Sequence, residues 1–394
     1  MSVTARLFFV MVLFFYSTVS AQEFPYSRSE PCPVDELFPR AREIAAKIPV
    51  NHSTDSTTYR HTIIHSKSST TRTPTDFVWR TIPLVLLNLS SCELTTTTIT
   101  RRIENGNVAT LLSTDDSKFL IFIEPRPQGT LWNWWNTPLQ VHTPENWVVA
   151  AVHWKNYSTK ESIVYTPGSA DLMNTFPQLA EVGRYHIRED IEEAYGLLRF
   201  VGSHAIPTLT VPEMMERFLP RLLESIISIE QADDHEVAMY RDGKYGINPI
   251  DRPFAVIGAN LQNAYRYTRS PVGARGLMQI MPDTCAGILK AYRPPLSSQC
   301  IGKEHSHPEE LAAAMLVFDD QLATLMRMLR KPNESREAFA ERPQIEIMLR
   351  ASYNTGPHRV SRLVRQEKNW TDRLLTETRG YLLKAKEAIK DSIN

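Results

Sequence analysis

One glutamate in residues 220–231 is placed for acid chemistry. In this segment, PRLLESIISIEQ, a helical repeat of about 100° per residue gathers four apolar side chains on one face: Leu222, Leu223, Ile226 and Ile227. The same repeat puts Glu230 in the middle of that face and Glu224 on the opposite, solvent side. Apolar surroundings disfavour a charged carboxylate and raise its pKa, so Glu230 could keep a proton for a leaving group near neutral pH. The alternative is that the helix ends here, with Glu230 capped or paired in a salt bridge.

The segment SPVGARGLMQIMPDT, residues 270–284, puts an amide among large apolar side chains. Gly273 and Gly276 allow a positive φ or a close backbone approach, and Pro282 ends the segment. An unpaired amide costs free energy in such surroundings. Gln279 is therefore expected to bind either an extended, amide-bearing ligand or a polar group of the core.

A third segment, PQIEIMLRASYNTGPHRV, predicts a helix that opens at Pro343 and closes at Asn354-Thr355-Gly356, before Pro357. Tyr353 and Asn354 fall in its last turn, where their polar ends can reach across a cleft. A plain helix end is the alternative.

Together the three segments resemble the lytic transglycosylases of glycoside hydrolase family 23, relatives of goose-type lysozyme that cleave bacterial peptidoglycan. The shared pattern is a glutamate ending an apolar helix, then S-x-x-G-A-x-G-L-M-Q-I-M-P-x-T, then A-x-Y-N-x-G-x-x-x-V. SHPEELAAAMLVFDDQLATLM also resembles the helix that the family places between these motifs, so the likeness covers roughly residues 212–390. The chain departs from the family in two ways. Gln231 stands where the family usually has serine, and the stretch from Glu230 to Ser270 is longer than usual.

The resemblance implies that Glu230 is the catalytic acid of a glycan-cleaving enzyme. It implies a groove or substrate-binding role for six further residues: Ser270, Gly276, Met278, Gln279, Tyr353 and Asn354. The implied reaction is cleavage of the β-1,4 linkage between N-acetylmuramic acid and N-acetylglucosamine. A single glutamate, assisted by the substrate's acetamido group, would leave 1,6-anhydromuramic ends, with neither metal nor cofactor.

Two alternatives stay open for the function. A hydrolytic muramidase would need a positioned water, which Asp233 or Asp234 could hold. A non-catalytic glycan-binding protein of envelope assembly would fit Gln231 and the long insertion. Zinc is not expected, because the sequence has no CxxC pair.

Two kinds of sequence pattern, found in different parts of the chain, predict an α+β protein. Residues 34–48 have helical spacing, and 76–166 carry short β-branched and aromatic runs separated by turn signals such as Asn105-Gly106, which favours antiparallel strands. Residues 169–205 are helical again, and helices dominate from Pro212 onward. We therefore expect a β-rich domain of unknown role over 22–205 and a mostly helical, lysozyme-like transglycosylase domain over 206–394.

The first residues predict export. Arg6 precedes the apolar run LFFVMVLFFY and a small-residue site that ends at Ala21, the pattern of a signal peptide over residues 1–21. An uncut membrane anchor is the alternative. The expected location is the periplasm or cell envelope of a bacterium, with peptidoglycan glycan strands as the partner and an envelope protein for the N-terminal domain. Lys plus Arg and Asp plus Glu both number 44, so net charge gives no attraction to nucleic acid.

Four cysteines in an exported chain favour disulfides. We expect the pairs Cys285–Cys300 and Cys32–Cys92. The first closes a loop of about 15 residues, worth roughly 3 kcal/mol in the chain-entropy account. Free buried thiols are the alternative.

Overall fold

The structure is a computed structural model of the chain. It describes residues 32–50, 52–53, 77–104, 107–114, 118–123, 139–155, 162–218, 221–232, 248–270, 272–297, 305–366 and 369–391. The predicted signal peptide, Cys300, Asp233 and Asp234 lie outside these ranges. The chain splits into two units, residues 1–32 and 33–394, and every helix and strand below belongs to the second.

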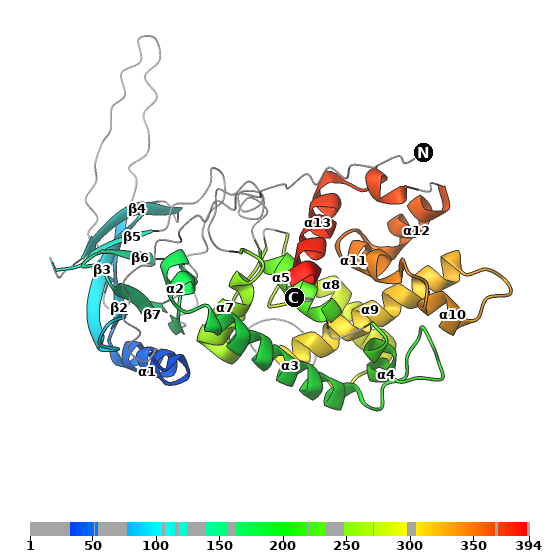
Figure 1. Cartoon of the computed structure of the whole chain (residues 1–394), viewed down its shortest axis with the longest axis horizontal. Helices are drawn as coiled ribbons and strands as arrows, with labels where there is room; N and C mark the ends of the chain where they lie inside the picture. The colour runs from blue at the N-terminus through cyan, green and yellow to red at the C-terminus, as the bar shows by residue number, and fades with distance from the viewer. Residues whose placement is uncertain are drawn as a thin grey trace, which may run out of the picture. The chain divides into compact units, whose positions relative to one another are not determined.

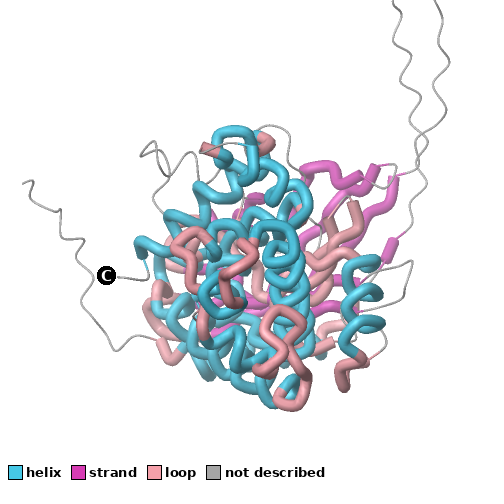
Figure 2. Tube along the Cα trace, turned by 90° about the vertical axis from the view of Figure 1, so that its right-hand side faces the viewer, coloured by secondary structure: helices cyan, strands magenta, loops and turns pink. Residues whose placement is uncertain are grey.

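An antiparallel sheet of six strands forms where the β-branched runs predict strands (Figures 1 and 2). Its order is β4-β3-β2-β7-β8, with β1 paired to β2. The bounds are β1 His52–Ser53, β2 Phe77–Asn88, β3 Leu94–Glu104, β4 Asn107–Thr114, β7 Trp147–Lys155 and β8 Ser162–Tyr165. A second sheet pairs β5 (Leu120–Ile123) with β6 (Leu139–Thr143).

Strand β2 contains a proline at a place where the sheet tolerates one. Pro83 lies between the last residue paired with β1, Arg80, and the first paired with β7, Leu84. On its other side it is aligned with Thr98 of β3. Its missing N–H therefore costs no ladder bond on the β1 and β7 side.

The centre of the sheet is buried on both faces. Every residue of β7 from 148 to 154 is buried, so a layer must cover each face. Helix α1 (Val34–Lys47) contacts β2, β7 and β8, and α2 (Ala170–Thr175) contacts β7 (Figure 1). Phe38 of α1 meets Phe176, just after α2, edge to face at 5.6 Å.

The remaining described elements are helices, which confirms the α+β class and the helical C-terminal half. They are α3 Gln178–Leu198, α4 Val211–Glu216, α5 Arg221–Gln231, α7 Arg252–Asn260, α8 Pro282–Tyr292, α9 His307–Leu329, α10 Arg336–Ala340, α11 Ile345–Thr355, α12 Pro357–Gln366 and α13 Thr376–Asp391, with 3-10 turns η2 Leu261–Asn263 and η3 Trp370–Arg373.

Helix α9 is the central helix of this half. Every residue from 311 to 319 is buried, so it packs on all sides, and it contacts α3, α4, α8, α10, α11 and α12. It begins with a capping box, in which Ser306 and Glu309 each accept a bond from the other's backbone N–H.

Helices α3 and α7 approach until their backbones touch. A Cβ on Gly183 would lie 1.9 Å from the Phe254 carbonyl oxygen, and one on Gly258 would lie 2.1 Å from that of Leu179. The predicted domain boundary near residue 205 falls between α3 and α4, and both helices pack on α9. Residues before that boundary thus contact the helical half, and the division into two domains stays a prediction.

The prediction that Glu224 faces solvent is wrong. Residues 222–229 of α5 are all buried, including Glu224, which is 8% exposed. Helices α7, α11 and α13 pack against α5, and Arg188 of α3 donates to the Glu224 carboxylate at 2.9 Å. The apolar face seen in the sequence is therefore not the only face of α5 that packs against other helices.

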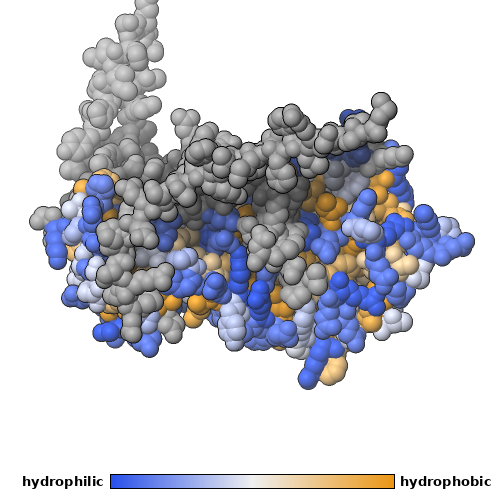
Figure 3. Space-filling model, in the orientation of Figure 1, coloured by the Kyte–Doolittle hydropathy of each residue, from blue (hydrophilic) through white to orange (hydrophobic). Residues whose placement is uncertain are grey.

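Disulfide bonding is confirmed for three of the four cysteines, Cys32, Cys92 and Cys285. The pairings Cys32–Cys92 and Cys285–Cys300 stay predictions. Among the described residues, no helix combines the length and apolar character needed to span a membrane. On the face drawn in Figure 3, hydrophilic and apolar residues are mixed over the described surface.

Candidate active site

The second motif forms a tight loop whose backbone explains its glycines. φ is positive at Gly273 (102°), Gly276 (76°) and Gln279 (50°). Arg275 and Ile280 exchange backbone hydrogen bonds of 3.1 and 3.2 Å across the turn. A left-handed glutamine is uncommon and costs on the order of 1 kcal/mol or more, so the surrounding contacts must hold it there.

Ser270 holds this loop from within. Its hydroxyl oxygen accepts a bond from the Ala274 N–H at 3.0 Å, and its own N–H donates to the Ala274 carbonyl at 2.9 Å. The contacts of this predicted substrate residue therefore shape the loop.

A buried carboxylate that the sequence did not reveal fixes the middle of the loop. Glu310 of α9 is 2% exposed and accepts the Leu277 N–H at 2.6 Å. A Cβ on Gly276 would lie 2.2 Å from a Glu310 oxygen. Glycine is thus required at 276 both by the positive φ and by the carboxylate beside it.

Gln231, which departs from the family pattern, joins α5 to the same loop. Its side-chain amide donates to the carbonyl oxygens of Gly276 at 3.1 Å and Leu277 at 2.7 Å. From α13, the Lys384 ammonium donates to the carbonyls of Ile229 and Ala232, at 3.2 and 2.7 Å, and so satisfies the C-terminal end of α5. The backbone that carries Glu230 is held from both sides.

Glu230 is half-buried in the last turn of α5, near two tyrosines. Burial, and then the charge of Glu230, raise the pKa of Tyr353 and of Tyr381 well above its usual range. Both phenols are therefore neutral near pH 7. The Tyr381 hydroxyl is buried, and both the charge of Glu230 and a hydrogen bond to its side chain contribute to the raised pKa. Tyr381 comes from α13, and sequence spacing gave no sign of its role.

Tyr353 joins the third motif to the second. Its hydroxyl donates to the Met278 carbonyl oxygen at 2.8 Å, and its ring stacks on Phe318 with centroids 5.1 Å apart. The prediction that Met278 lines the groove is wrong. Its side chain is 0% exposed and packs in the core. Its backbone oxygen is what serves the site.

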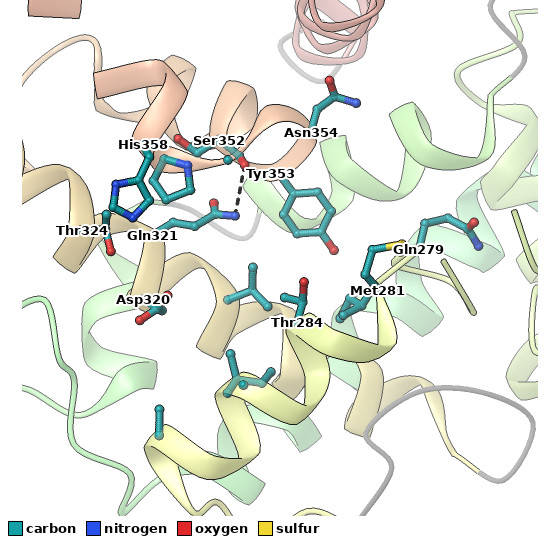
Figure 4. A pocket seen from close by; sticks show the side chains of 17 residues that line it. Gln279, Met281, Thr284, Asp320, Gln321, Thr324, Ser352, Tyr353, Asn354 and His358 are labelled. Atoms are coloured by element: carbon teal, nitrogen blue, oxygen red, sulfur yellow. Dashed lines mark hydrogen bonds between the residues drawn. The ribbon is translucent and has the colours of Figure 1, made fainter. Parts of the chain in front are cut away.

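A groove of about 600 Å³ opens beside these residues, within the range of about 300–1,000 Å³ usual for ligand sites. Figure 4 shows Tyr353 pointing into it between Gln279 and Gln321, with Thr324 and His358 toward the other end. Gln279, Tyr353 and Asn354 line it, as the motifs predict, while Glu230 is not part of its lining.

Two of the predicted groove residues are also tied to the protein. The Gln279 amide donates to the Gly276 carbonyl at 2.6 Å, and the Asn354 side-chain oxygen accepts the Thr378 hydroxyl at 2.7 Å. Both residues line the groove while their side chains are bonded within the protein.

Six polar groove residues were missed from the sequence: Thr284, Asp320, Gln321, Thr324, Ser352 and His358. Asp320 and Thr324 lie one turn apart on α9, where polar residues interrupt an otherwise buried helix. That interruption was the available signal.

Comparison with protein-family models, with curated proteins and with solved structures found no match. The likeness to family 23 lytic transglycosylases therefore stays a prediction that rests on the three motifs.

Proposed function

We propose that this protein cleaves the β-1,4 linkage between N-acetylmuramic acid and N-acetylglucosamine in bacterial peptidoglycan, leaving 1,6-anhydromuramic ends. Its helical half would be a lysozyme-like transglycosylase domain. Its location would be the periplasm or cell envelope. The β-rich half would bind an envelope partner.

One observation supports the proposal most strongly: side chains of the first and third motifs form hydrogen bonds to the backbone of the second. Gln231, next to Glu230, bonds to Gly276 and Leu277, and Tyr353 bonds to Met278. These contacts join segments 45 to 75 residues apart in the chain. A core could pack without such bonds, but a glycan site needs an acid, a polar groove loop and a tyrosine side by side.

The first chemical step asks for one acid. Protonated Glu230 gives its proton to the glycosidic oxygen as the bond to C1 of the muramic acid breaks. The acetamido oxygen of the same sugar supports the positive charge that develops at C1, so no second carboxylate is needed as nucleophile.

The second step returns the proton. Glu230, now a carboxylate, takes the proton of the sugar's C6 hydroxyl while that oxygen bonds to C1. The products are an N-acetylglucosamine hydroxyl and a 1,6-anhydro ring. No water is consumed, and Glu230 ends in its starting form.

The neighbouring tyrosines support this single-acid scheme. Because both phenols keep their protons, they add no negative charge beside the carboxyl. Tyr353 and Tyr381 are positioning residues for Glu230, and Gln279 and Asn354 offer amides to the N-acetyl groups of the glycan.

Glu230→Gln tests the proposal, with Glu216→Gln as the matched control because Glu216 is exposed at the end of α4. On purified peptidoglycan, turnover should fall about 10²–10⁴-fold in the first variant, the usual worth of general acid catalysis, and stay unchanged in the control. Circular dichroism should report the same fold for all three proteins. Near-normal turnover by Glu230→Gln would refute the assignment. Glycan binding without cleavage by the unaltered protein would favour a non-catalytic role.

A further inference from the structure

A cluster of three metal-ligating side chains lies outside the groove. His186 and Asp190 stand one turn apart on α3, and His307 is the first residue of α9. Their candidate ligand atoms all lie within 4.8 Å of one another. Asp190 and His307 are 3% and 2% exposed, and His186 is half-buried.

The hydrogen bonds assign the proton of His307. Its Nε2 lies 2.8 Å from the carbonyl oxygen of Ala264, which can only accept, so Nε2 carries the hydrogen. In the neutral ring, Nδ1 then presents a lone pair to the Asp190 carboxylate at 3.3 Å. A lone pair facing a carboxylate calls for a cation between them.

His186 directs a second nitrogen at the same carboxylate oxygen. Its Nε2 lies 3.6 Å from Asp190 Oδ2, the oxygen that faces His307. A single proton can bridge only one imidazole to that oxygen, whereas a metal ion binds both.

The surrounding bonds match those of a metal site. A ligating histidine almost always donates its other N–H to a carbonyl or carboxylate, as His307 does to Ala264. Gln262 accepts the His307 backbone N–H at 3.1 Å, which turns its amide nitrogen toward Asp190 Oδ1 at 2.6 Å. That nitrogen also lies 3.3 Å from His186 Nε2, a long contact that an ion would replace.

We propose that His186 Nε2, Asp190 Oδ2 and His307 Nδ1 bind one zinc-type divalent ion. The separations of 3.3 and 3.6 Å are close to the edge of about 3.3–3.4 Å in a tetrahedron with bonds of about 2.0–2.1 Å. A small closure of the half-buried His186 ring brings the third atom to the ion. Water takes the fourth position on the exposed side of His186.

Such an ion would be structural. It joins α3 to the first residue of α9, and α9 supplies Asp320 and Thr324 to the groove and Glu310 to the loop. The ion therefore fixes the start of the helix on which the site is built, without touching the substrate. Metal content and stability can be measured apart from any activity.

The test uses untagged protein, stripped with a chelator and then titrated with ZnCl₂ by calorimetry. We expect one zinc per chain, the same stoichiometry by mass spectrometry of the metal after desalting, and a higher melting temperature with zinc. His186→Ala and Asp190→Asn should each weaken zinc binding at least 100-fold, because loss of an outer-shell partner alone costs about 10–100-fold. His142→Ala, at an exposed histidine of β6, is the control and should bind as the unaltered protein does.

Two results would overturn the proposal. One is the absence of stoichiometric zinc in the unaltered protein, which would mean that a proton on His307 holds the cluster together. The other is unchanged zinc binding in both variants. Should Asp190→Asn fail to fold, His186→Ala decides alone, since this side chain is partly exposed and its loss disturbs packing least.

Discussion

The sheet and the loop at residues 270–281 are built on different principles. The buried residues of β2 and β7 are almost all apolar, as in Leu84–Leu87 and Val148–Val152. Around the loop, the protein buries or half-buries a carboxylate, an amide and a phenol: Glu310, Gln231 and Tyr353. Burying polar groups costs free energy unless each is bonded, and here each is. Stability alone explains the sheet, but it does not explain why polar groups were gathered at the loop.

The largest expected effect on stability lies in the sheet. Leu86→Ala removes a side chain with 0% exposure from β2 and should lower the free energy of unfolding by about 2–5 kcal/mol. Urea unfolding measures this change. Turnover per folded molecule should stay the same at a temperature where the variant is folded. A matching loss of turnover would break the distinction between the two regions.

A smaller loss of stability with a larger loss of function is expected at Glu310. Glu310→Ala leaves the Leu277 N–H buried without its acceptor, which should cost about 1–3 kcal/mol. The loop that carries Gln279 would lose its fixed position, so turnover of the folded variant should fall. Glu310→Gln keeps an acceptor oxygen and should recover most of both. Full turnover by Glu310→Ala would show that the loop does not need this carboxylate.

The smallest effect is expected in a comparison of two tyrosines, Tyr353 and Tyr165. Tyr353→Phe removes the bond to Met278 and should cost about 0.5–1.5 kcal/mol at neutral pH. Burial raises the pKa of Tyr353, and also that of Tyr165 in β8, well above the usual value. Above about pH 10 the unfolded tyrosine ionises while the folded one keeps its proton, so stability from this source is complete below pH 10 and is lost as pH rises.

The difference in unfolding free energy between the unaltered protein and Tyr353→Phe should therefore shrink above pH 10. Tyr165→Phe should show the same trend, because burial is the main cause in both. Only Tyr353→Phe should change turnover. A constant difference at all pH values would contradict the raised pKa of Tyr353, and a turnover loss in Tyr165→Phe would contradict the separation of the two regions.

The sequence predicted the elements better than their partners. β-branched runs predicted the strands between residues 76 and 166, and helical spacing predicted α1, α5 and α11, because these signals are local. Glu224 was wrongly predicted to face solvent because an apolar arc identifies one buried face of a helix, but does not tell whether other helices pack on its remaining faces. Met278 was wrongly predicted to line the groove because its side chain packs in the core while its carbonyl oxygen accepts the bond from Tyr353.

The residues that were missed act over long separations. Glu310 meets Leu277 across 33 residues, and His307 meets Asp190 across 117. The lack of a CxxC pair predicted no zinc, yet a histidine–aspartate set needs no such motif. No sequence periodicity encodes these contacts, since they depend on how α9 packs against α3 and against the loop.

The central claim is that one carboxyl performs both proton transfers, so that no water enters the product. Mass spectrometry of the fragments released from purified peptidoglycan tests this most directly. We predict muramic ends that are lighter than reducing ends by one water, as 1,6-anhydro rings must be, with release about 10²–10⁴-fold slower in Glu230→Gln. Fragments that carry only reducing ends would contradict the claim and make the protein a hydrolytic muramidase.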